Sequence, residues 1–357
     1  MRKVTRITVV ALLSFVIACV GSVAYIAYDF TSKPSSSSDA EVIFEVLPAQ
    51  SFNVIAKKLQ DLGLIRNAVV FSLYARATNQ RSLLKRGEYL LRMNMLPKEV
   101  LSVITSGKSI SKPFTVAEGL NIYEISDLYE RQGFGKKEDF LELVKNKQLI
   151  KQLLGEEAPS LEGYLFPETY MITKFEDTKN LISSMVRRFF VVYNELGVEA
   201  ALPDWKRNQI VTLASIIEKE TGAPEDRPLV SSVFHNRLRK KMKLQTDPTI
   251  IYGIADVTGV VPNNIRKDDI LKPTKYNTYV IDGLPPGPIS NPGKDALKAT
   301  FKPAPSNYLY FVSRNDGTTT FSESLGNHNR AVQKYQLTVS EREGKSWRDK
   351  NKKSVSK

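Results

Sequence analysis

Residues 207–221 contain the side chains best suited to acid–base chemistry. On a helical wheel, Glu218 falls on a broad apolar arc, one turn after Ala214. A carboxyl group in such surroundings stays protonated near neutral pH, because desolvation disfavours its charged form. We therefore predict that Glu218 is a general acid able to protonate a glycosidic oxygen, with the small Ala214 leaving room for a substrate. The alternative is a structural ion pair with a base such as Arg237.

Two further carboxylates bear on the type of reaction. Glu220 lies at the other flank of the arc, and we rank it second because it is in the last helical turn, where the helix dipole opposes a negative charge. Asp247 directly precedes Pro248, so its default role is to cap a helix. Most glycosidases need two carboxylates, and a Glu218–Asp247 pair would give hydrolysis. If Glu218 acts alone, it must serve as acid and then as base, and the attacking oxygen must come from the sugar.

Composition argues against several other classes of site. The chain has one cysteine, Cys19, and two histidines, His235 and His328, so we expect neither thiolate chemistry nor a transition-metal centre. No cofactor is expected. The formal charge is +13, but the basic residues are scattered and no fingerprint of a nucleic-acid-binding fold is present. The charge therefore favours an anionic polymer or lipid as partner, and no nucleic acid.

The first residues predict the compartment. Residues 7–28 carry no charge and are long enough to cross a bilayer core as a helix, and the basic residues in 1–6 keep that end in the cytoplasm. A cleaved lipoprotein signal with Cys19 as the lipidated residue is the alternative, but the apolar run continues beyond it, which favours an uncleaved anchor. We therefore expect a single-pass protein of the cytoplasmic (inner) membrane whose bulk faces the exterior or periplasm. Residues 29–41 read as a flexible linker.

The exported part reads as an α+β protein with two folded regions. Residues 42–112 follow the order strand, helix, helix, strand, helix. This small α/β module is similar in layout to LysM-type glycan-binding modules; a docking or spacer domain is the alternative. An aromatic-rich segment at 161–170 is interpreted as a buried connector or as a loop that stacks on sugars.

The second folded region is the larger one. Residues 113–205 form a connecting region, 206–340 a mixed α+β catalytic domain, and 341–357 a basic tail to which no role is assigned. The elements expected from periodicity, capping and turn residues are helices at 122–132, 137–145, 177–196, 207–221, 229–241 and 328–336, a helix start near 246–249, and a hairpin joining 308–312 to 318–321.

Several motifs resemble those of the endolytic murein transglycosylases, the YceG-like family. In chain order they are Leu161–Tyr170, Ala214–Thr221, Val233–Leu238, Leu244–Thr249 with Tyr252 and Gly253, Tyr276–Tyr279, Gly283–Pro292 and Asn327–Arg330. The resemblance covers residues 42–337. It implies a lytic transglycosylase that cuts the β-1,4 bond between N-acetylmuramic acid and N-acetylglucosamine within a strand and leaves a 1,6-anhydro end. Glu218 matches the family's essential glutamate.

The resemblance also implies binding residues and partners. The residues that would bind acetamido groups, hydroxyls or peptide carboxylates, or form a cleft wall, are Asn236, Arg237, Gln245, Thr246, Asp247, Tyr276, Asn277, Ser290 and Asn291. A helix cap or a buried hydrogen bond explains each of them equally well. The implied partners are peptidoglycan glycan strands, the cytoplasmic membrane and peptidoglycan synthases, near which nascent strands would be ended. The rival hypotheses are a hydrolytic muramidase and a non-enzymatic envelope protein that binds glycan or synthases.

Overall fold

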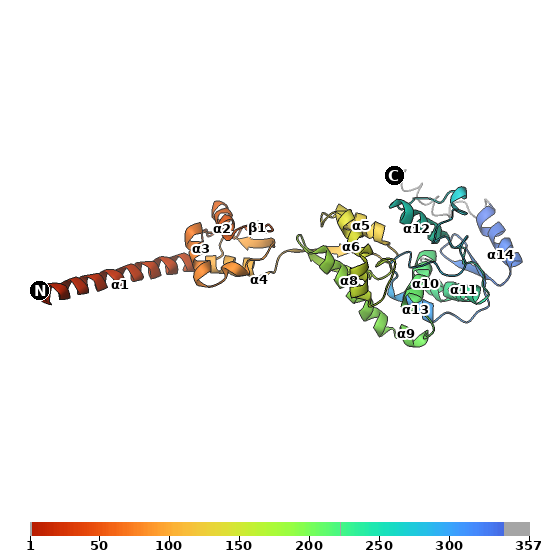
Figure 1. Ribbon diagram of the computed structural model, residues 1–357. Helices are drawn as coiled ribbons and strands as arrows, with labels where there is room; N and C mark the ends of the chain where they lie inside the picture. Colours follow the sequence, from red (N-terminus) through yellow and green to blue (C-terminus); the bar gives the residue numbers. More distant parts are fainter. Residues whose placement is uncertain (1, 222, 339–357) are drawn as a thin grey trace. The chain divides into compact units, whose positions relative to one another are not determined.

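The chain divides into two units (Figure 1). The computed structural model describes residues 2–221 and 223–338, so the basic tail predicted at 341–357 lies outside the described residues. Unit 1 comprises Met1–Pro113 with Met171–Glu176, and unit 2 comprises Phe114–Tyr170 with Asp177–Lys357. Helices predominate, and the strands form three two-stranded sheets among the described residues, which confirms the α+β class.

Unit 1 begins with the helix α1 (Arg2–Ser32). Its segment Leu12–Ser32 has 21 residues and a mean hydropathy of 1.8, so by length and composition it is able to span a membrane. An N-terminal apolar helix is thus present, as predicted. It continues beyond residue 28, so the first four residues of the predicted linker are helical.

The folded part of unit 1 has the predicted order of elements. They are β1 (Glu41–Val46), α2 (Phe52–Asp61), α3 (Ala68–Ala77), a 3-10 turn (Arg81–Leu83), β2 (Gly87–Arg92) and α4 (Pro97–Ser106). The strands β1 and β2 pair antiparallel, from Glu41 opposite Arg92 to Val46 opposite Gly87. The Asn67 side chain accepts hydrogen bonds from the second and third backbone N–H groups of α3 and so fixes the start of that helix.

Unit 2 carries most of the helices. The strands β3 (Ser111–Thr115) and β4 (Thr169–Thr173) pair with each other, and each has residues in both units. The other elements are α5 (Ile122–Arg131), α6 (Lys137–Lys145), α7 (Lys147–Leu154), α8 (Thr178–Glu195), α9 (Val198–Ala201), α10 (Arg207–Glu220), α11 (Arg227–Arg239), α12 (Asp247–Thr258), α13 (Lys294–Phe301), β5 (Tyr310–Ser313), β6 (Thr319–Ser322) and α14 (Leu325–Val332), with 3-10 turns at Pro224–Asp226 and Lys267–Asp269 and a π-helical turn at Gln333–Leu337. The sequence did not predict α7, α9 and α13, because helices of four to eight residues are too short for a clear helical period.

The helix α10 lies at the centre of unit 2, where it packs against α11, α12 and α13. It is buried on nearly all sides: Thr212 and Ser215, from the polar side of the wheel, have no exposed surface. Their hydroxyls donate to backbone carbonyls of the same helix at 2.6 and 2.7 Å. The helical-wheel prediction assumed that one face of the helix is exposed to solvent. It therefore could not show which flank of α10 borders a cavity.

Most of the segment 161–170 is a buried connector: residues 161–166 are buried, and the strand β4 begins at Thr169. Leu161, Tyr164 and Leu165 have no exposed surface, so these side chains are not available to stack on sugars. Gly163 has φ +85°, and a Cβ there would lie 2.6 Å from Pro288 and 2.7 Å from Val211. Only glycine fits this position without displacing its neighbours.

Glu162, in the same segment, is a buried carboxyl held by several hydrogen bonds. It accepts from the Ile122 backbone N–H at 2.9 Å, from Asn291 Nδ2 at 3.0 Å and from the Tyr252 hydroxyl. Burial raises its pKa to about 8, although these hydrogen bonds oppose the shift. The group therefore joins the start of α5 to the loop before α13.

We expect Glu162 to make stability fall with rising pH. Its folded pKa lies above the unfolded value, so its contribution is complete below about pH 4.5 and is lost as the pH rises through about 8. Urea unfolding at several pH values should show a flatter profile for Glu162→Gln, which keeps the size and carries no charge. Equal pH slopes for the two proteins would contradict this assignment.

Candidate active site

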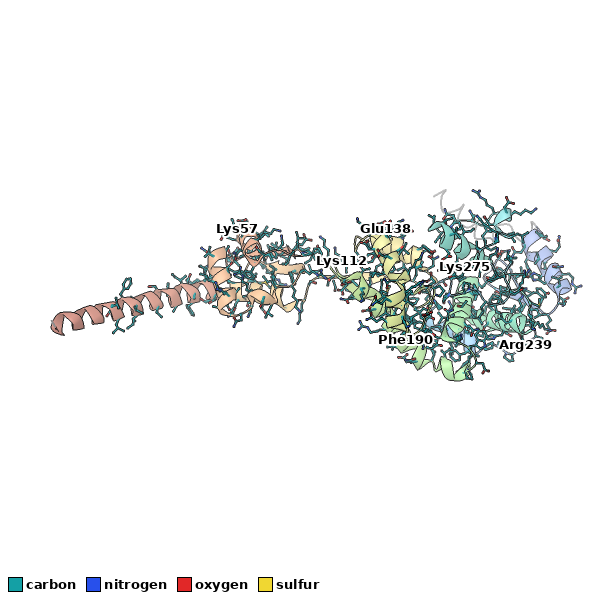
Figure 2. All side chains as sticks on the ribbon, in the orientation of Figure 1. Lys57, Lys112, Glu138, Phe190, Arg239 and Lys275 are labelled. Carbon is teal, nitrogen blue, oxygen red and sulfur yellow. The ribbon has the colours of Figure 1, made fainter. Side chains whose placement is uncertain are left out.

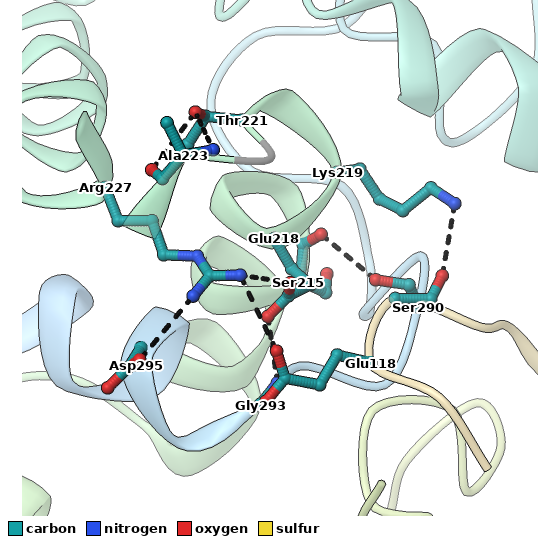
Figure 3. Close-up of polar contacts among 11 residues, drawn as sticks. Glu118, Ser215, Glu218, Lys219, Thr221, Ala223, Arg227, Ser290, Gly293 and Asp295 are labelled. Atoms are coloured by element: carbon teal, nitrogen blue, oxygen red, sulfur yellow. Dashed lines mark hydrogen bonds and ion pairs between the residues drawn. The ribbon is translucent and has the colours of Figure 1, made fainter. Parts of the chain in front are cut away.

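Glu218, the acid predicted from the sequence, lies in a buried ion pair (Figure 3). Arg227 Nη2 donates to Glu218 Oε1 at 2.7 Å, and the Gly293 backbone N–H donates to Oε2 at 2.9 Å. The Arg227 and Glu218 side chains are 7% and 5% exposed. Arg227 also lies 3.6 Å from Glu118 and 3.8 Å from Asp295, so three carboxylates share one guanidinium group.

The neighbours of Glu218 act on its protonation in opposite directions. Burial has the largest effect and raises the pKa of this carboxyl above its ordinary value, although the Gly293 N–H and the Arg227 charge oppose the shift. A guanidinium that donates directly to a carboxylate stabilises the ionised form, which has no proton to give. The contact is an ion pair of the kind that the sequence analysis gave as the alternative role of Glu218. Its base is Arg227, whereas the sequence analysis suggested Arg237.

Glu220 lines a pocket of about 420 Å³. It lies two residues beyond Glu218 and so on nearly the opposite side of α10. Its carboxyl accepts a hydrogen bond from the hydroxyl of Thr246, the N-cap residue of α12. Arg237, Gln245 and Asp247 also line this pocket, and Glu218 does not. The structure thus brings the second candidate carboxylate together with four of the predicted binding residues.

The surroundings of Glu220 favour a carboxyl that exchanges protons near neutral pH. Its pKa is raised to about 7, chiefly by burial and in part by the charge of Asp247, against the opposing effects of the Thr246 hydroxyl and Arg237. The carbonyl end of α10 also disfavours a negative charge there. That dipole was the reason to rank Glu220 second, but for a proton donor it is an advantage because it helps to keep the carboxyl neutral.

An aromatic wall completes the pocket, and its residues had no assigned role in the sequence analysis. Tyr310 of β5 and His328 of α14 stack with their ring centroids 5.1 Å apart, and the Arg237 guanidinium lies 5.1 Å from the centre of the Tyr310 ring. The Tyr279 hydroxyl donates to Asp247 Oδ1 at 2.7 Å. Aromatic faces of this kind pack well against pyranose rings. Tyr279 and His328 belong to recognised motifs, but no sequence period connects either of them to Glu220.

Most of the other predicted binding residues are buried inside the protein. Asn236, Tyr276, Asn277, Ser290 and Asn291 are at most 4% exposed. The three asparagine amides donate to backbone carbonyls of neighbouring segments at 2.8–2.9 Å. Ser290 Oγ donates to a carbonyl of α10 at 3.1 Å. These contacts fix the loops around α10. They are buried hydrogen bonds, which the sequence analysis gave as the alternative to a binding role for these residues.

Arg237 and Gln245 differ in how they border the pocket. Arg237 is 8% exposed and donates to the backbone carbonyls of Lys243, Leu244 and Leu309, so its main contribution is to hold two segments together. Gln245 is exposed and has φ +50°, a conformation that residues other than glycine rarely adopt. Backbone strain of this type is typical of functional sites, and it leaves the Gln245 side chain at the pocket wall.

Several known proteins are similar to this chain in sequence and fold. A profile of the YceG-like family matches residues 44–334. An endolytic murein transglycosylase from Bacillus subtilis (strain 168) is 30% identical over 317 residues, which cover 84% of this chain and 86% of the relative. One from Streptococcus pneumoniae serotype 2 is 29% identical and covers 78% of this chain, which spans only 55% of that longer relative. The crystal structure of a YceG-like protein from Listeria monocytogenes matches with a TM-score of 0.56 at 31% identity, covering 81% of this chain and 98% of that one.

Proposed function

The chain belongs to the YceG-like family, and we propose that it is an endolytic lytic transglycosylase of peptidoglycan with Glu220 as its general acid and base. The substrate bond is the β-1,4 linkage between N-acetylmuramic acid and N-acetylglucosamine within a nascent strand. The observation that carries the assignment of Glu220 is its position on a pocket wall with a pKa raised to about 7. Glu218, the residue favoured from sequence, is the competing candidate.

The proposed reaction needs one carboxyl group in two successive roles. Neutral Glu220 donates its proton to the glycosidic O4, and the C1–O4 bond breaks. The resulting carboxylate then accepts the proton of the C6 hydroxyl as that oxygen bonds to C1. The strand ends in 1,6-anhydro-N-acetylmuramic acid, and Glu220 is protonated again. The other product carries the new O4 hydroxyl, and no water is consumed.

Product analysis tests this reaction directly. The purified chain is incubated with uncrosslinked glycan strands in ¹⁸O-labelled water, and the new ends are examined by mass spectrometry. We expect anhydro ends without ¹⁸O, because the attacking oxygen belongs to the sugar. Reducing ends that carry ¹⁸O would identify a muramidase in which Asp247 activates water. This rival function is worth testing because Asp247 lines the same pocket as Glu220. Intact strands would support the non-enzymatic alternative.

Replacing Asp247 by asparagine is expected to shift the pH profile and to leave the anhydro product. The Asp247 charge helps to raise the pKa of Glu220, so its removal lowers that pKa. In the wild type, kcat/KM should fall as the pH rises above about 7, because Glu220 loses its proton. In Asp247→Asn the same fall should begin up to about one pH unit lower. An unchanged upper limb, or complete loss of cleavage, would contradict a supporting role for Asp247.

The cellular setting forms part of the proposal. We assign α1 to a single-pass membrane anchor with the N-terminus in the cytoplasm, supported by the length and hydropathy of Leu12–Ser32. Such an anchor would hold unit 2 near the membrane, where strands emerge from their synthases, and cleavage there would end strand elongation. The strand–helix–helix–strand order of unit 1 supports a LysM-like role in glycan binding.

A further inference from the structure

An apolar groove of about 380 Å³ lies between the end of α1 and the helix α3 in unit 1. Its walls include Ile26, Ala27 and Phe30 of α1 and Val70, Leu73 and Tyr74 of α3. On the outer side of α3, Val69 and Leu73 are 68% and 60% exposed. Exposed apolar side chains beside an apolar groove are unfavourable in water, so this surface is suited to an apolar ligand.

The position of the groove along α1 indicates what that ligand is. Residues 26–30 belong to the last turns of the apolar segment Leu12–Ser32. Tyr25 and Tyr28 of the same turns are 68% and 71% exposed. Tyrosine is enriched where a membrane helix crosses the interface between lipid and water. When α1 spans a bilayer, the groove therefore opens at the level of the lipid headgroups and the first carbons of the acyl chains.

A basic pocket of about 410 Å³ lies on the adjoining face of the same helix. Lys57, Arg76 and Arg81 line it, and Leu73 lines both this pocket and the apolar groove. Lys57 projects from α2 at the surface of unit 1 and pairs with Asp61 (Figure 2). Among the residues that the structure describes, neither Arg76 nor Arg81 has a carboxylate within ion-pair distance. Two such arginines beside an apolar groove match the phosphate and the acyl chain of one anionic lipid.

We propose that unit 1 binds an anionic phospholipid of the outer face of the membrane, with an acyl chain in the groove between α1 and α3 and the phosphate against Arg76 and Arg81. This inference rests on the proposal that α1 spans the membrane, and it is independent of the catalytic assignment. It makes α3 an interfacial helix, so that unit 1 is attached to the bilayer surface by more than its anchor.

Spin labels on the full-length chain in nanodiscs test the groove. Cys19 is the single cysteine, so a Cys19→Ser background accepts one label at a time at Val69→Cys, Leu73→Cys, Leu13→Cys or Ile43→Cys. Ile43, on β1, is the matched control because it is an apolar residue that is 64% exposed. Discs of phosphatidylglycerol and phosphatidylcholine are probed with oxygen, which partitions into lipid, and with a water-soluble nickel complex. We expect positions 13, 69 and 73 to be accessible to oxygen and position 43 to be accessible to nickel.

The four positions separate the possible failures. Lipid-like accessibility at 13 together with water-like accessibility at 69 and 73 overturns the groove and leaves the anchor. Water-like accessibility at 13 overturns both. Lipid-like accessibility at 43 as well would indicate general embedding of unit 1 and would also contradict a specific groove.

Retained lipid tests the headgroup site and the identity of the occupant. Native mass spectrometry of the full chain released from the same discs should show bound phosphatidylglycerol, reduced several-fold in Arg76→Gln/Arg81→Gln and unchanged in the surface control Lys98→Gln. Equal retention in the three proteins contradicts the phosphate site. A photoreactive residue at position 73 in native membranes should give a lipid adduct, and a protein adduct there would show that a partner's helix occupies the groove.

Discussion

Replacing Glu220 by glutamine is expected to abolish strand cleavage, with a loss in kcat/KM of about 10³-fold or more. Glutamine keeps the shape of the side chain and still accepts the hydrogen bond that the Thr246 hydroxyl donates to Glu220. It cannot give a proton to O4 or take one from the C6 hydroxyl. Folding and strand binding should be retained, as measured by circular dichroism and by co-sedimentation with peptidoglycan. The rate is measured as anhydro ends formed from uncrosslinked strands.

The matched control is Glu218→Gln, two residues earlier on the same helix. We expect this variant, where folded, to keep most of its activity, because Glu218 binds Arg227 and the Gly293 N–H and does not line the pocket of Glu220. The opposite result would be loss of cleavage in Glu218→Gln and activity near wild type in Glu220→Gln. That result would restore Glu218 as the acid, as the sequence predicted.

Replacing Arg227 by methionine is expected to cost about 3–5 kcal/mol of unfolding free energy. The substitution removes the base from a pair whose side chains are 7% and 5% exposed, so Glu218 is left as a buried charge. Solvent screening does little to reduce this cost, because neither partner is accessible. Urea unfolding measures the effect, followed by tryptophan fluorescence in a Trp347→Phe background, which leaves Trp205, in unit 2 beside His235, as the single tryptophan.

A double-mutant cycle then identifies what Glu218 does. In Arg227→Met/Glu218→Gln no buried charge is left unpaired, because the other two carboxylates near Arg227, Glu118 and Asp295, are 49% and 65% exposed. The double variant should therefore be more stable than the sum of the single changes predicts, by about 1–3 kcal/mol. Additive effects would show that the pair does not stabilise unit 2. Full stability in Arg227→Met would contradict the structural role of Glu218 and would leave its carboxyl free for chemistry.

The sequence alone was sufficient for the local structure and for the family. The helix α6 has the predicted bounds, and α5 and α10 each end one residue before the predicted end, because apolar periods and terminating residues are local signals. Three kinds of element were missed. The helices α7, α9 and α13 are too short to show a period, β4 begins at the end of a segment that was interpreted as a connector or loop, and the helical end of α1 lies in residues that were predicted as linker. The motif at 214–221 also narrowed the candidate acids to the two glutamates of one helical turn.

The choice between those two glutamates required the tertiary structure. A helical wheel contains information about one helix only. It correctly predicted that the apolar arc of α10 is buried, but it could not show which residues pack against each flank of the helix. Arg227, from the next helix, and Gly293, from a loop 75 residues away, surround Glu218, while Thr246 and the pocket wall from β5 and α14 surround Glu220. The pKa of a carboxyl depends on its burial and on nearby charges, and here these come from segments distant in the chain. Sequence spacing therefore located the acidic turn, and only the packing of these segments distinguished a structural ion pair from a candidate proton donor.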